Sequence, residues 1–63
     1  MKKIERKGKI GFIATVSEFQ KKGILDNHVT GIAALQFIII YQDHTIEEVS
    51  GTVAQKLINA TYK

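Results

Sequence analysis

The sequence predicts a small α+β domain that is mostly helical, in which an N-terminal basic strand or hairpin precedes about three helices. Three observations predict it: apolar and polar residues alternate near the N-terminus, two Ser- or Thr-led segments have the form of helix starts, and a long uncharged tract fills the middle of the chain. The 63 residues make a single small domain, with residues 1–9 as a basic arm or first hairpin strand. A chain of this size buries only about 60% of the surface that its unfolded form exposes, so its stability is marginal.

Residues 9–16 have the alternation of a half-buried strand. From Ile10 to Val16 every even position is apolar, and period-two alternation with β-branched and aromatic residues favours a strand. The segment RKGK at residues 6–9 predicts a tight turn, because Gly8 accepts a positive φ. We therefore expect a strand from Lys9 to Val16, with a hairpin before it.

The next segment has the signals of a short helix. Ser17 followed three residues later by Gln20 has the form of a capping box. Lys21 and Lys22 suit the C-terminal end of a helix, and Gly23 suits the left-handed position just past it. The pattern predicts one or two helical turns over residues 17–23.

The tract from Asn27 to Tyr41 contains no Asp, Glu, Lys or Arg. Its segment 33–36, AALQ, favours helix, whereas the β-branched and aromatic residues of 38–41 favour a strand. About 15 residues is long for a strand, so we predict a helix over 28–42, with a strand as the alternative. Such a helix is apolar on nearly every face and would have to be buried all round.

The C-terminal third predicts a continuous amphipathic helix. Thr45 to Glu48 has a second capping-box form, and apolar residues then recur at three- and four-residue spacing as far as Ala60. Either the close approach of a neighbour or simple tolerance would explain Gly51 inside this helix. The segment TIEEVSGTVAQKL resembles fragments of a helix-turn-helix, but its two pieces abut with no residues left for the turn. One continuous helix is therefore preferred, and no family is assigned.

The absence of Cys excludes disulfides and thiolate metal sites, and it is consistent with a reducing, cytoplasmic compartment. His28 and His44 are sixteen residues apart, which is more typical of cap or surface residues than of metal ligands. Small domains without disulfides or metals often complete their cores with a partner chain. We therefore expect a homodimer with no metal and no cofactor.

Membrane and enzyme classes are also disfavoured. The uncharged tract is shorter than the roughly 20 apolar residues that span a bilayer, and charged residues follow the apolar segment 10–16 too soon for a signal peptide. Ser17 and Ser50 are explained as a helix cap and a helix surface position. Glu47 and Glu48 would point about 100° apart on a helix, which does not suit an acid/base pair. We expect no catalytic residues and no small-molecule substrate.

The positive charge is concentrated at the N-terminus. Residues 1–9 sum to +4 and residues 10–63 to −1, which gives the net charge of +3. Cations in such a cluster can neutralise phosphates and release counterions, so five residues are candidate nucleic-acid contacts. These are Lys2, Lys3, Arg6, Lys7 and Lys9. The alternative is a solvated terminus whose lysines blunt the edge of a strand.

The apolar run FIIIY is the candidate partner or oligomer interface. Its residues are Phe37, Ile38, Ile39, Ile40 and Tyr41. The leading hypothesis is a small, non-catalytic regulatory or inhibitory protein that binds itself and a protein target, of the kind that phages, plasmids or bacterial operons encode. The alternative is a small DNA-binding transcriptional regulator that uses its basic N-terminus on phosphates.

Overall fold

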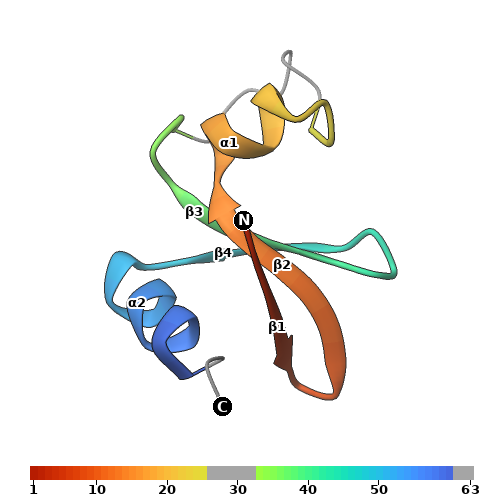
Figure 1. Cartoon of the computed structure of the whole chain (residues 1–63), viewed down its shortest axis with the longest axis vertical. Helices are drawn as coiled ribbons and strands as arrows, with labels where there is room; N and C mark the ends of the chain where they lie inside the picture. The colour runs from red at the N-terminus through yellow and green to blue at the C-terminus, as the bar shows by residue number, and fades with distance from the viewer. Residues whose placement is uncertain (26–32, 61–63) are drawn as a thin grey trace.

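The protein is a four-stranded antiparallel sheet with two short helices (Figure 1). The computed structural model describes residues 1–25 and 33–60. Strand order follows chain order, β1-β2-β3-β4. The elements are β1 (Lys2–Arg6), β2 (Lys9–Thr15), α1 (Val16–Lys21), β3 (Phe37–Tyr41), β4 (Ile46–Val49) and α2 (Gly51–Ala60). The prediction of a mostly helical domain with about three helices is therefore wrong.

The N-terminal hairpin is confirmed. Arg6 pairs with Lys9 across the turn, and the two turn residues Lys7 and Gly8 both have positive φ, 56° and 76°. Two consecutive positive φ values match the right-handed twist of the flanking strands, which is why two-residue hairpin turns favour them. Residues 2–6 are thus the edge strand of the sheet and not a free basic arm.

Helix α1 follows β2 directly, and its cap differs from the predicted one. The Glu18 N–H donates to Thr15 Oγ1 at 3.2 Å, so Thr15 caps the helix and Ser17 lies inside it. At the other end Gly23 has a φ of 74°, as predicted for a left-handed residue past the helix. The short helix is confirmed, with its start shifted towards the strand.

The helix predicted over residues 28–42 is wrong where the structure describes it. Residues 37–41 form β3, which pairs with β2 on one side and β4 on the other. The β-branched run at 38–40 suits a pleated strand that is flanked on both edges. Before it, residues 33–36 form a turn in which the Gln36 N–H donates to the Ala33 carbonyl at 3.0 Å. Residues 26–32, with His28, lie outside the described part of the chain.

The continuous helix predicted from Thr45 is also wrong. Residues 46–49 form β4, and α2 begins only at Gly51. Ser50 caps it, because its Oγ accepts the Val53 N–H at 3.2 Å. No atom lies within 4 Å of the position that a Cβ on Gly51 would take, so no close neighbour requires this glycine.

The two sides of the sheet are covered differently. Helix α2 packs on one side, which we call the α2 face, with a core of Ile4, Ile13, Ile39, Tyr41, Val49 and Ala54. On the opposite side α1 covers one end, with a core of Ala14, Val16, Phe19 and Ile38. Figure 1 shows α1 beyond one end of the strands and α2 well away from it, beside β1. The rest of the second side is uncovered among the described residues, and we call it the open face.

Candidate functional site

The five predicted phosphate contacts do not form one basic surface. Lys2 and Arg6 lie on the α2 face, because each is two residues away from the buried Ile4 along β1. Lys3 lies on the opposite side of the same strand, and Lys7 occupies the hairpin turn. Lys9 begins β2. The five cations form one cluster in the sequence. In the structure, the alternation of side chains along the strands distributes them over both sides of the sheet and the hairpin turn.

Two acidic residues from distant parts of the chain pair with three of these cations. Glu47 on β4 accepts Arg6 Nη2 at 3.4 Å and Lys7 Nζ at 3.5 Å. Asp43, in the turn between β3 and β4, accepts Lys9 Nζ at 3.3 Å. Arg6 Nη1 is buried and has no hydrogen-bond partner among the described residues, so its pair with Glu47 is a single contact and not a fork. We call the end of the sheet that carries the β1–β2 and β3–β4 turns the hairpin end. It is a mixed-charge cluster of Arg6, Lys7, Lys9, Asp43 and Glu47 with little excess positive charge.

Tyr41 is at the centre of this cluster. Its hydroxyl donates to Glu47 Oε1 at 2.6 Å, and Lys9 Nζ lies 4.5 Å from the centre of its ring. Burial first, and then the hydrogen bond to Glu47, raises the pKa of Tyr41 to about 12. The same hydrogen bond, with Arg6 and Lys7 nearby, lowers the pKa of Glu47 below its usual value. Tyr41 is thus a neutral donor and Glu47 an ionised acceptor over the whole physiological range. This hydrogen bond links β3 to β4.

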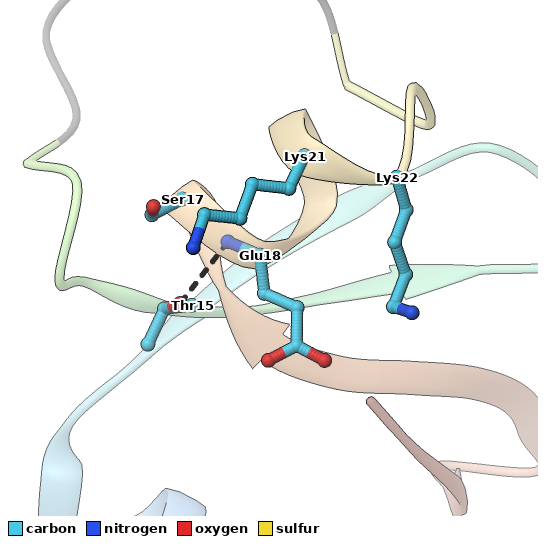
Figure 2. A pocket seen from close by; sticks show the side chains of 5 residues that line it. All are labelled: Thr15, Ser17, Glu18, Lys21 and Lys22. Carbon is cyan, nitrogen blue, oxygen red and sulfur yellow. Dashed lines mark hydrogen bonds between the residues drawn. The ribbon is translucent and has the colours of Figure 1, made fainter.

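A shallow pocket of about 390 Å³ lies beside the start of α1 (Figure 2). It is lined by Thr15, Ser17, Glu18, Lys21 and Lys22. Thr15 already caps the helix, and Glu18 binds the N-terminal amine of Met1 at 2.6 Å, which lowers the pKa of Glu18. Figure 2 shows Lys21 and Lys22 pointing in different directions. The polar groups do not converge on one point, so the pocket gives no support for a catalytic or anion site.

The FIIIY segment is mostly core. Phe37, Ile39 and Tyr41 pack on the α2 face, and Ile38 is buried under α1. Only Ile40 has part of its side chain on the open face. The segment predicted as an interface therefore supplies one residue to an accessible surface.

The open face carries an accessible apolar row that crosses three strands. Phe12 on β2 pairs with Ile40 on β3, and Ile40 pairs with Ile46 on β4. Directly paired residues project on the same side of a sheet. Phe12 is 41% exposed and Ile46 47% exposed. Neither residue was predicted as a site, and the segment from Ile46 to Val49 has no apolar-polar alternation that would have indicated a strand.

A second row lies beside the first, towards the hairpin end of the open face. Glu5 pairs with Ile10, and the Gln42 N–H donates to the Ile10 carbonyl at 2.9 Å. These three residues, with Gly8, Lys9 and Asp43, line a depression of about 270 Å³. The open face thus presents an apolar ridge next to a hollow.

Other site classes find no support among the described residues. Within residues 1–25 and 33–60 no group of three metal-ligating side chains comes together, and His44 is exposed in a turn. No helix in that part of the chain has the length and apolar character that crossing a membrane requires. Comparisons with protein-family models, with curated proteins and with solved structures found no match to this chain.

Proposed function

We propose that this chain is a small, non-catalytic regulatory or inhibitory protein of the cytoplasm that acts by binding another protein chain through its open face. The observation that carries the proposal is the row of Phe12, Ile40 and Ile46, in which Phe12 and Ile46 are exposed and Ile40 is half-buried. Sheets ordinarily bury an apolar face against another layer. Contiguous apolar surface rimmed by polar residues is typical of interaction sites.

The placement of the charged groups supports binding over catalysis. The titratable groups with shifted pKa values at this end of the sheet, Tyr41, Glu47 and Asp43, are engaged with one another, with Thr45 or with cations. Burial and these contacts account for the pKa shifts, and structural ion-pair networks shift pKa values in this way as well as active sites.

The alternative, DNA binding through the basic N-terminus, loses support from the same contacts. A phosphate would have to compete with Glu47 for Arg6 and Lys7, and with Asp43 for Lys9. Neutralised cations release fewer counterions, and counterion release supplies most of the sequence-independent affinity for DNA. Protein binding is therefore the preferred function.

Site-specific photocrosslinking tests the proposal. A benzoylphenylalanine at position 12 places the reactive group on the open face, and the same residue at Gln55, an exposed position on α2, is the control. In cells of the source organism we expect covalent adducts to a protein from position 12 and none from position 55. Ile46→Lys in the position-12 chain should abolish them, because it puts a charge into the same row. Equal labelling from both positions, or none from position 12, would overturn the proposal.

A further inference from the structure

We infer that the partner that fits the open face is a second copy of this chain, packed sheet against sheet with its strands running in the opposite direction. The inference rests on the proposed function, because it uses the same surface. It goes further by naming the occupant and the geometry. Three independent features of the described residues lead to it: the position of α1, the shape of the face and its charges.

Helix α1 determines the direction of approach. It covers one end of the side of the sheet that carries the open face. There Ala14 is 6% exposed and Ile38 is 0% exposed, so a partner cannot contact that end of the sheet. Packed sheets lie about 10 Å apart, which is about the diameter of a helix. A second sheet can therefore lie in the same layer as α1, beside it. A copy turned to run antiparallel places its own α1 at the other end, so that the two helices lie at opposite ends of the interface.

The antiparallel orientation brings the apolar ridge of one copy onto the hollow of the other. The two uncovered rows are Lys3–Phe12–Ile40–Ile46 and Glu5–Ile10–Gln42. Consider a two-fold axis that lies in the plane of the interface, perpendicular to the strands and midway between these rows. It places Phe12 of each copy over Ile10 of the other copy. The depression of about 270 Å³ beside Ile10 has room for a benzyl group, and Phe12 is the exposed aromatic residue of the adjoining row. Each copy thus offers both the knob and the recess, as an isologous interface requires.

The charges are self-complementary in the same arrangement. Lys3 begins the first row and Glu5 begins the second, and both are exposed. The two-fold axis places Lys3 of one copy opposite Glu5 of the other, twice per dimer. A polyanionic partner would be repelled by Glu5 and by Glu48, which is exposed on the far edge strand. The mixed signs favour a second copy over a nucleic acid.

Sedimentation equilibrium of the full chain from about 1 μM to about 1 mM tests the inference. We expect the mean mass to rise with concentration from 7.0 kDa towards twice that value. Phe12→Lys should weaken self-association about tenfold or more, whereas Gln55→Lys, which adds the same charge on α2, should leave it unchanged. Phe12 is partly exposed, so the variant is expected to fold, and the dispersion of its amide NMR spectrum verifies this. A folded Phe12→Lys that associates like the parent chain would overturn the inference.

The charge pairing gives a second test that tolerates small changes in stability. Lys3→Glu and Glu5→Lys should each weaken the dimer several-fold, and the double variant should recover most of the loss. Additive losses in the double variant would overturn the two-fold arrangement. A chain that stays monomeric at about 1 mM, yet gives position-12 adducts to a protein of another mass, would overturn this inference and leave the proposed function standing. Loss of both signals would overturn both.

Discussion

Replacing Gly11 by alanine should destabilise the fold, because atoms of β3 already fill the space that a Cβ at this position would take. A Cβ at position 11 would lie 2.9 Å from the Ile40 carbonyl oxygen and 3.0 Å from both Ile39 Cγ2 and Tyr41 Cδ1. Gly11 pairs directly with Tyr41, whose ring lies over it. The carbonyl oxygen cannot turn away without breaking the pairing of the strands. The added methyl group must therefore displace the Tyr41 ring or separate the strands.

The magnitude follows from two opposing contributions. Adding one methyl group to a close-packed site costs about 1–3 kcal/mol, and weakening the hydrogen bond from Tyr41 to Glu47 costs about 1 kcal/mol more. Alanine recovers about 0.4–1 kcal/mol by restricting the unfolded chain. The net loss is about 2 kcal/mol, against a total stability of about 3–9 kcal/mol for a domain of this length. For such a small domain this lowers Tm by about 8–16 °C.

Urea and thermal unfolding followed by circular dichroism measure the effect, at one fixed protein concentration so that self-association contributes equally. Gly51→Ala is the matched control, because a Cβ there meets no atom within 4 Å and alanine favours a helix. We expect that control to be as stable as the parent chain or more stable, by up to about 1 kcal/mol. If Gly11→Ala unfolds at the parent temperature, or if both variants lose equal stability, the packing argument at Gly11 is refuted.

Three further predictions concern the Ser50 cap of α2, the loss of stability at acid pH (the acid limb of the stability curve) and the charged hairpin. Ser50→Ala should cost about 1 kcal/mol in urea unfolding while Ser50→Asp keeps the cap; equal losses would contradict the capping role. The lowered pKa of Glu47 stabilises the fold above its unfolded value of about 4.5, and this stability is lost as pH falls through the folded pKa. Stability of Glu47→Gln should therefore depend less on pH below about 5, and an unchanged acid limb would argue against the Tyr41 contact. DNA anisotropy should give a log K against log salt slope clearly shallower than about −4.5, the value for five phosphate contacts, because Arg6, Lys7 and Lys9 are paired with carboxylates; a slope near −4.5 would favour the DNA-binding alternative.

The parts of the fold that were predicted correctly depend on signals between near neighbours. The turn at Lys7 and Gly8 and the left-handed Gly23 each require only a few residues to be recognised. The strand alternation of β2 belongs to the same class. These interactions form whatever the rest of the chain does, so sequence alone identifies them.

The errors came where distant pairing overrides a local signal. Thr45 to Glu48 has the form of a helix start, yet these residues add to the edge of β3, and the cap is Ser50. The absence of charge between Asn27 and Tyr41 predicts one long element, whereas the structure has a turn at 33–36 and then a separate strand. Pairing with β2 and β4 decided the structure of 37–41.

The residues of the candidate site could be predicted from the sequence even less well than the fold. Which acid neutralises Arg6 depends on the register of β4, about forty residues away along the chain. The exposure of Phe12 depends on where α1 stops covering the sheet. Neither quantity has a local signature, so the cations and the FIIIY segment were more conspicuous than the residues that form the open face.

The order of the strands has a consequence for how the chain folds. Each strand pairs with the next one along the chain, so β1–β2 and β3–β4 are hairpins closed by short turns. Hairpins of this kind form in about 1–10 μs. Pairing β2 with β3 must instead close the segment from residue 16 to residue 36, at a larger entropic cost. Docking of two preformed hairpins is therefore the expected rate-limiting step, so substitutions at the β2–β3 junction should slow refolding, whereas those in α2 should mainly speed unfolding.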